Sequence, residues 1–254
     1  MIKQSFSWWC FVNRGLEPEA LVAGAAKAGY HGVDLVGEEF WPLVRKHGLE
    51  ISAINGHGTL QEGLNHREYA ERIEGELRTN IAKASEWKIP VLICLTGNRA
   101  GISEAEGLEN SAELLNRVAS LAADAGVMLA VELLNSKVDH KDYQCDHTPW
   151  GVELIKQVNS PAVKLLYDIY HMQIMEGDII RTIRAEHQHF GHYHTAGNPG
   201  RGQPDETQEI YYPAIYKAIV ATGYSGYISH EFIPSIDPVQ AMAKAFNDCK
   251  AALS

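Results

Sequence analysis

Two patterns of apolar residues alternate along the chain. Short runs rich in β-branched residues are followed by longer segments in which apolar residues recur every three or four positions. The first pattern is typical of buried strands and the second of amphipathic helices, so their alternation predicts repeated βα units around a parallel sheet. The expected strands are residues 2–8, 32–36, 50–55, 91–95, 128–133, 163–168, 190–195 and 227–232. The expected helices include residues 18–28, 67–87, 106–125, 151–158, 212–222 and 238–252.

Eight βα units favour a closed barrel over an open sheet. Barrels of this kind typically need about 250 residues, and the chain has 254. An open doubly wound sheet usually carries a glycine-rich phosphate turn after its first strand, whereas this chain has Trp8-Trp9-Cys10-Phe11 there. We therefore predict an α/β fold in which residues 1–254 form a single (β/α)₈ TIM barrel domain.

The charge balance argues against nucleic acid and membranes as partners. Lys and Arg number 22 against 32 Asp and Glu, a formal net charge of −10, and an acidic surface repels phosphate backbones and anionic membranes. No apolar run approaches the ~20 residues of a membrane span, and the first residues lack the apolar core and cleavage site of a secretory signal. We expect a cytoplasmic protein whose four cysteines are free thiols, because none of them forms a CxxC pair.

Four acidic or imidazole side chains stand at the ends of successive predicted strands. Glu132, Asp168, His194 and Glu231 close the fifth, sixth, seventh and eighth strands, and each spacing is near the length of one βα unit. In a parallel barrel the C-terminal strand ends meet on one face, where such enzymes carry their functional groups. We therefore expect these four side chains to converge.

Three carboxylates that converge repel one another unless their pKa values rise or a cation lies between them. A divalent cation is the simpler solution, and oxygen ligands with a single nitrogen favour Mn²⁺ or Mg²⁺, with Co²⁺ as a third option. Any one acidic strand-end residue could instead cap a helix or form a salt bridge. Four in successive units favour a metal site formed by Glu132, Asp168, His194 and Glu231.

Three further residues are candidates for binding a substrate. His171 is expected to begin the loop above the sixth strand, Arg201 lies in a glycine-rich turn after the seventh, and His57 follows the third. Arg201 suits a carboxylate because its planar group can donate two parallel hydrogen bonds. The alternatives are a solvated loop charge for Arg201 and a packing residue for His171. Weaker candidates for the pocket wall are Glu38, Glu39, Trp8, Trp9 and Trp41.

Several short segments make the chain resemble a known family. They are Glu132-Leu-Leu-Asn135, Tyr167-Asp168-Ile-Tyr-His171-Met-Gln, Gly191-His192-Tyr-His194 with Pro199-Gly-Arg201-Gly, and Ser229-His230-Glu231-Phe232. They resemble the xylose isomerase-like barrels, most closely the hydroxypyruvate isomerases and next the ketose 3-epimerases. One position departs from the closest pattern: where this chain has His194, hydroxypyruvate isomerases often carry glutamine and epimerases carry histidine.

The resemblance implies roles for the site residues. Glu132 and Glu231 would be paired acid and base catalysts that also touch the metal, Asp168 and His194 would complete the coordination, and His171 and Arg201 would hold the substrate. Such a site would isomerise a small carbonyl substrate through an enediolate, as in the conversion of hydroxypyruvate to tartronate semialdehyde. The alternatives are a ketose 3-epimerase, an apurinic endonuclease-type metal hydrolase and a sugar-binding barrel without catalysis. Homo-oligomerisation stays open at this point.

Overall fold

Eight parallel strands follow one another in chain order around a closed barrel in the computed structural model, which describes residues 2–253. The strands are β1 (Lys3–Ser7), β2 (Gly32–Asp34), β3 (Glu50–Asn55), β4 (Val91–Cys94), β5 (Met128–Glu132), β6 (Val163–Asp168), β7 (Phe190–Thr195) and β8 (Tyr227–His230). Helices lie between them, so the predicted (β/α)₈ TIM barrel is confirmed. Such strands are covered on both faces, which is why their sequences are nearly continuous apolar runs.

The helices include all six that the apolar pattern predicts. They are α1 (Trp8–Phe11), α2 (Pro18–Ala28), α3 (Trp41–Lys46), α4 (Ala70–Trp87), α5 (Glu104–Ala125), α6 (Thr148–Val158), α7 (Ile169–Met175), α8 (Ile179–Glu186), α9 (Tyr212–Ala221) and α10 (Pro238–Leu253), with 3₁₀ turns η1 (Glu38–Phe40), η2 (Arg67–Tyr69) and η3 (His187–His189). The prediction lacks α1, α3, α7 and α8, because helices of four to eight residues are too short to show a helical period. Trp8 was expected to end β1 and instead begins α1.

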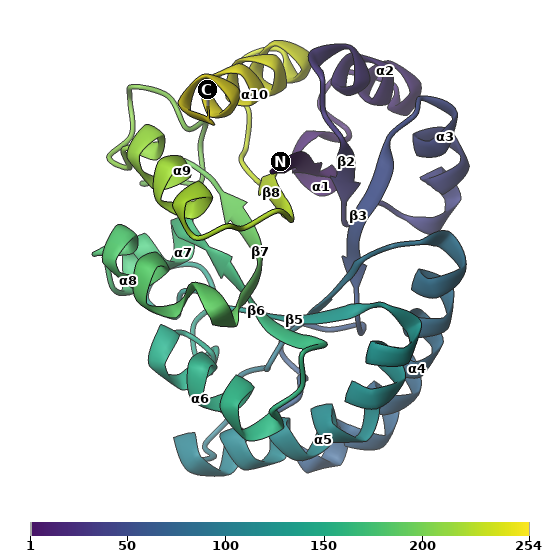
Figure 1. Cartoon of the computed structure of the whole chain (residues 1–254), viewed down its shortest axis with the longest axis vertical. Helices are drawn as coiled ribbons and strands as arrows, with labels where there is room; N and C mark the ends of the chain where they lie inside the picture. The colour runs from purple at the N-terminus through teal and green to yellow at the C-terminus, as the bar shows by residue number, and fades with distance from the viewer. Residues whose placement is uncertain (1, 254) are drawn as a thin grey trace. The chain divides into compact units, whose positions relative to one another are not determined.

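The chain divides into two compact units, of which the first consists of Met1–Ser52, Asp178–His187 and Tyr193–Ser254. Within it, β1 pairs with β2 and β8, and β7 pairs with β8. Helix α10 packs against α2 and α9 outside these strands (Figure 1). Helix α2 ends at Gly29, whose left-handed φ of 107° lets the chain turn back toward β2.

The second unit consists of Ala53–Gly177 and Gln188–His192. Strand β4 pairs with β3 and β5, and β5 pairs with β6. Helix α5 packs between α4 and α6 on the outer side (Figure 1). The Ser103 hydroxyl accepts a hydrogen bond from the backbone N–H of Glu106 and so fixes the start of α5.

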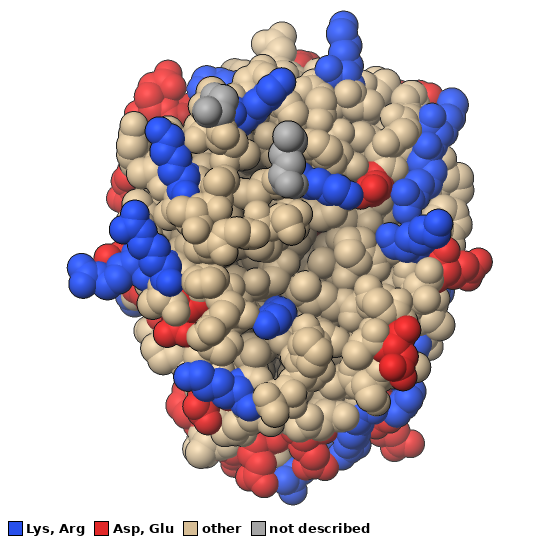
Figure 2. Space-filling view, viewed as in Figure 1, with Lys and Arg blue, Asp and Glu red and all other residues tan. Residues whose placement is uncertain are grey.

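Charged side chains of both signs cover the solvent side of α4 and α5. Arg78 pairs with Glu74 and Arg117 pairs with Glu113, and Figure 2 shows the two signs mixed near the foot of the view. Exposed pairs of this kind contribute little to stability individually, so they indicate a solvated surface. None of the helices in residues 2–253 combines the length and apolar character that a membrane crossing requires.

The four cysteines are all buried in the protein. Cys10, Cys94, Cys145 and Cys249 are free thiols, as the absence of a CxxC pair predicts. Burial raises the pKa of Cys94 and of Cys249 to about 12. These two thiols therefore stay protonated and unreactive at neutral pH.

Candidate functional site

Glu132 and Asp168 end neighbouring strands of the second unit. Strands β5 and β6 run in parallel with Glu132 opposite Leu166, so Asp168 lies two residues farther along the same direction. Both side chains are buried, at 7% and 1% exposure. The Tyr143 hydroxyl donates to the Glu132 carbonyl oxygen at 2.9 Å and fixes the backbone where β5 ends.

Asp168 also caps the helix that follows it. Its Oδ1 accepts hydrogen bonds from the backbone N–H groups of Tyr170 at 2.8 Å and His171 at 3.2 Å, which starts α7 directly at the strand end. Its Oδ2 lies 3.6 Å from His171 Nε2. The capping role and a ligand role therefore use different oxygens, and one does not exclude the other.

His171 was expected in a loop, and that expectation is wrong because the Asp168 cap begins α7 here. The ring is fully buried. Its Nδ1 lies 3.2 Å from the backbone N–H of Asn135, which can only donate, and 2.6 Å from Asn135 Nδ2. Nδ1 is therefore the acceptor, and the proton of the neutral ring lies on Nε2, toward Asp168.

Asn135 is a residue that the strand-end argument does not select. Its side chain holds the His171 ring and also reaches Asp139 Oδ2 at 2.7 Å. It lies three residues beyond the end of β5, within the segment that begins at Glu132. That short spacing was the available signal, but the contact with His171 depends on the fold.

His194 and Glu231 contact each other in the first unit. His194 Nδ1 lies 2.9 Å from Glu231 Oε2, and both side chains are buried. Burial by itself raises the pKa of Glu231, but attraction to His194 and Arg201, the hydrogen bond with His194 and the one donated by Trp9 hold that pKa well below the usual range. Glu231 is therefore ionised at neutral pH.

Arg201 lies against the same carboxylate. Its Nη2 donates to Glu231 Oε2 and its Nε donates to the Glu231 carbonyl oxygen at 3.3 Å. The turn that carries it is closed by paired backbone hydrogen bonds between Gly197 and Gly202. With its side chain only 15% exposed, Arg201 is not the solvated loop charge of the alternative interpretation.

Trp9 supports this arrangement from the other side of Glu231. Its Nε1 donates to Glu231 Oε1 at 2.8 Å, and the Arg201 guanidinium lies 5.4 Å from the centre of its ring. The other two tryptophans proposed for the wall have packing roles. Trp8 packs on Phe40, and the Trp41 indole donates to a backbone carbonyl. Glu38 and Glu39 are exposed.

Asp34, at the end of β2, is the second residue that sequence reasoning missed. Its Oδ2 lies 3.3 Å from His194 Nε2, and its Oδ1 accepts from the Ser52 hydroxyl. All three side chains are fully buried. The available signal was a carboxylate inside an apolar strand, but the predicted strand ran to residue 36 and placed Asp34 in its middle.

His57 has a backbone partner in the second unit. Its Nε2 accepts from the Leu95 N–H at 2.9 Å. Burial lowers the pKa of His57 to about 4, so the ring is neutral at pH 7. This contact links the ends of β3 and β4, and a role for His57 in substrate binding stays a prediction.

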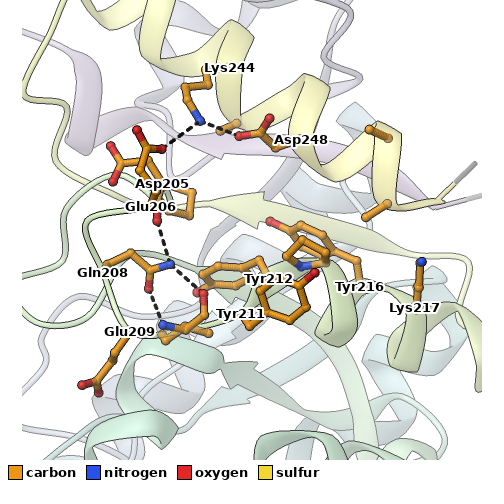
Figure 3. A pocket seen from close by; sticks show the side chains of 16 residues that line it. Asp205, Glu206, Gln208, Glu209, Tyr211, Tyr212, Tyr216, Lys217, Lys244 and Asp248 are labelled. Carbon is orange, nitrogen blue, oxygen red and sulfur yellow. Dashed lines mark hydrogen bonds and ion pairs between the residues drawn. The ribbon is translucent and has the colours of Figure 1, made fainter.

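A separate cleft of about 640 Å³ lies elsewhere in the first unit, beside α9 and α10 (Figure 3). Tyr212 and Tyr216 line it. Lys244, which also lines it, forms ion pairs through its Nζ with Asp248 Oδ2 at 2.9 Å and Glu206 Oε2 at 3.9 Å. Its lining contains none of the predicted site residues. The site described above is therefore distinct from this cleft.

Several known proteins resemble this chain, and three of them illustrate the likeness. Hydroxypyruvate isomerase of Escherichia coli (strain K12) is 31% identical over 166 residues, which cover 63% of this chain and 64% of that protein. The structure titled AP endonuclease, family 2, from Brucella melitensis has a TM-score of 0.86 at 24% identity and covers 96% of this chain and 98% of that one. That of D-psicose 3-epimerase with D-tagatose from Clostridium cellulolyticum H10 has a TM-score of 0.77 at 18% identity, covering 99% and 97%.

The two structural likenesses are below 25% identity and show the fold alone. The chain spans just under two thirds of the length of the E. coli relative. The sequence model of the family described as xylose isomerase-like TIM barrel matches residues 22–249 of this chain. Because this match covers most of the chain, and agrees with the resemblance of its four segments, the protein belongs to the xylose isomerase-like TIM barrel family.

Proposed function

We propose that the protein is a metal-dependent isomerase of a small sugar or keto acid, with the conversion of hydroxypyruvate to tartronate semialdehyde as the favoured reaction. The observation that carries this proposal is a buried donor set at the ends of β5, β6, β7 and β8: Glu132, Asp168, His194 and Glu231. These strands are consecutive in the barrel, and each of the four side chains is of a type that can offer an oxygen or nitrogen ligand. The E. coli relative carries the name hydroxypyruvate isomerase.

The donor set fits a divalent cation chemically. Its four members are at most 7% exposed, and buried carboxylates are costly unless positive charge compensates them. Three oxygen ligands with one nitrogen suit Mn²⁺ or Mg²⁺, and Co²⁺ is a further option. A cation held by these residues would polarise the substrate carbonyl and stabilise the negative charge that develops on its oxygen.

Proton transfer falls to the two glutamates. Glu231 is ionised at neutral pH because its pKa is lowered, so it can accept a proton from the carbon beside the carbonyl. Glu132 is the second carboxylate that can exchange a proton with the neighbouring carbon. In this scheme one glutamate removes the proton, an enediolate forms, and a glutamate returns a proton to the adjacent carbon.

Arg201 and His171 position the substrate in this scheme. A guanidinium has five N–H donors, so Arg201 can hold Glu231 and also a substrate carboxylate such as that of hydroxypyruvate. His171 carries its proton on Nε2, as its Asn135 partner requires, and can donate to a substrate oxygen. In this scheme the partner of the protein is a small carbonyl compound.

A ketose 3-epimerase is the second candidate, and His194 favours it, because epimerases carry histidine where hydroxypyruvate isomerases often carry glutamine. An epimerase would use the same two glutamates on opposite faces of one substrate carbon. The two reactions differ in whether the substrate must carry a carboxylate. Arg201 beside the site therefore favours the keto acid, and His194 favours the sugar.

The test is solvent proton exchange with the Mn²⁺-loaded protein in D₂O. We expect deuterium to enter hydroxypyruvate or its product, as followed by proton NMR, and we expect chelator to stop it. Glu132→Gln and Glu231→Gln should each abolish the exchange. Ketohexoses assayed in parallel separate the isomerase from the epimerase.

The matched control is Glu19→Gln, which removes an exposed carboxylate paired with Lys46 and should leave exchange unchanged. Circular dichroism establishes that each variant is folded. Exchange that persists in both Glu132→Gln and Glu231→Gln would rule out the paired glutamates. Exchange at full rate in chelator would rule out the metal.

A further inference from the structure

His194 lies between two carboxylates in the first unit. Nδ1 is 2.9 Å from Glu231 Oε2, and Nε2 is 3.3 Å from Asp34 Oδ2. Glu231 belongs to the proposed donor set, whereas Asp34 does not. The two ring nitrogens therefore face groups with different roles, and Nδ1, on the Glu231 side, is the nitrogen placed to bind the same ion as Glu231.

An imidazole binds a metal ion through a nitrogen that carries no proton, and the other nitrogen then carries one. That remaining N–H must find an acceptor when it is buried. His194 is fully buried, and Asp34 places an oxygen at Nε2. When an ion lies at Nδ1, a carboxylate at Nε2 holds the remaining ring proton there and makes Nδ1 a better ligand.

Asp34 is itself held in place. The Ser52 hydroxyl donates to Asp34 Oδ1, and Asp34 Oδ2 lies 3.3 Å from His194 Nε2. Asp34 ends β2, and Ser52 lies in the middle of β3. The three side chains form a buried row, Ser52–Asp34–His194, that ends at Glu231.

We propose that Asp34 is a positioning residue that keeps the proton of His194 on Nε2 when a metal ion is bound, so that Nδ1 faces the ion. This inference rests on the proposed metal centre and adds to it a residue that does not itself bind the ion. Ser52 acts one step farther away by orienting the Asp34 carboxylate.

The first experiment reads the tautomer directly. The protein labelled with ¹⁵N on histidine is loaded with diamagnetic Mg²⁺, and the ring nitrogens are assigned by long-range ¹H–¹⁵N NMR. We expect the proton of His194 on Nε2. A proton on Nδ1 in the Mg²⁺-loaded protein would overturn the proposal even if no variant could be made.

The second experiment measures Mn²⁺ binding by the EPR signal of the free ion in wild type, Asp34→Asn and Ser52→Ala. Outer-shell partners of this kind typically contribute about 10- to 100-fold to metal affinity, so we expect a loss in that range for Asp34→Asn. The loss in Ser52→Ala should be smaller. The asparagine amide can donate to Nε2, so we also expect the His194 proton to move to Nδ1 in Asp34→Asn.

The internal control is His230, whose ring bonds to Thr195 and Gln4 and whose NMR signals should not change. Their retention also reports that the variant is folded. Unchanged Mn²⁺ affinity in a folded Asp34→Asn would overturn the role of Asp34 while leaving the metal centre intact. Failure of wild type to bind Mn²⁺ would instead overturn the proposed function.

Discussion

Two buried histidines on neighbouring strands differ in the groups that contact their rings. His194 on β7 and His230 on β8 are both fully buried, and the strand register places His194 opposite Ser229, next to His230. Successive residues of a strand point to opposite sides, so the two rings enter different surroundings. His194 has a carboxylate at each ring nitrogen.

His230 meets only neutral groups in the contacts of its two nitrogens. Its Nδ1 lies 2.9 Å from the Thr195 hydroxyl, and its Nε2 lies 2.9 Å from Gln4 Oε1. Tyr30 packs edge-on against the ring. Burial lowers the pKa of His230 to about 3, so the ring is neutral and serves the packing behind the sheet. The charge of the neighbours, rather than the depth of burial, distinguishes the proposed ligand His194 from the core histidine His230.

The largest effect is expected when each of the two histidines is replaced in turn. His194→Ala removes a proposed ligand and should weaken Mn²⁺ binding by more than the roughly 100-fold upper range of outer-shell residues. His230→Gln keeps a polar group among Gln4 and Thr195 and should change the affinity by less than about threefold, since less than 1 kcal/mol is involved. Titration followed by the EPR signal of free Mn²⁺ measures both. Equal losses in the two variants would remove the distinction.

The next effect concerns acid stability. A histidine whose folded pKa is lowered below its unfolded value of about 6.5 stabilises the fold above that pH, and the stability is lost as the pH falls. For His230, with a folded pKa of about 3, the loss between pH 6.5 and 4.5 is roughly 2 kcal/mol. His57 acts in the same direction.

His230→Gln should therefore be less stable than wild type at pH 7, but should lose roughly 2.5 kcal/mol less on acidification to pH 4.5. Urea unfolding at the two pH values gives the comparison. The contribution of Glu231, whose folded pKa is lowered, is lost only as the pH falls below its unfolded value, near 4.5, and stays outside most of this window. Identical losses in variant and wild type would show that His230 does not titrate as inferred.

The smallest effect tests single hydrogen-bond donors near each ring. Trp9→Phe removes the Nε1 donor to Glu231 Oε1 and should weaken Mn²⁺ binding by about 1 kcal/mol, or roughly fivefold. Tyr30→Phe removes a donor beside His230, to the Met242 carbonyl, and should leave Mn²⁺ binding unchanged. A larger effect from Tyr30→Phe than from Trp9→Phe would argue that the two surroundings are coupled.

The barrel itself could be predicted from the sequence because its signal is repeated. Each of the eight strands is a short apolar run, and each helical segment between them repeats its apolar residues every three or four positions. Both patterns can be recognised in one sequence without an alignment. The four proposed ligands were selected by the same regularity, because Glu132, Asp168, His194 and Glu231 each close a predicted strand. A polar residue at the end of an apolar strand is visible without any knowledge of contacts.

The supporting residues could not be predicted in this way. Asp34 and His194 are 160 positions apart, and Asn135 and His171 are 36 positions apart, so neither contact follows from local pattern. Trp9 was one of three tryptophans with equal claims, and only the fold places its indole on Glu231. The periodicity of the sequence identifies the residues at strand ends, whereas the side chains that contact those residues depend on tertiary packing.

Because Asp168 caps α7, a screen for folding would not detect every substitution of this residue that affects the proposed chemistry. Oδ1 holds the first turn of the helix while Oδ2 lies on the side of His171, so one side chain serves helix formation and the proposed chemistry. Asparagine is an equally good cap but lacks the negative charge. A lineage that drifted to asparagine here would keep its helix while weakening the proposed metal site, and a measurement of stability alone would not reveal that change.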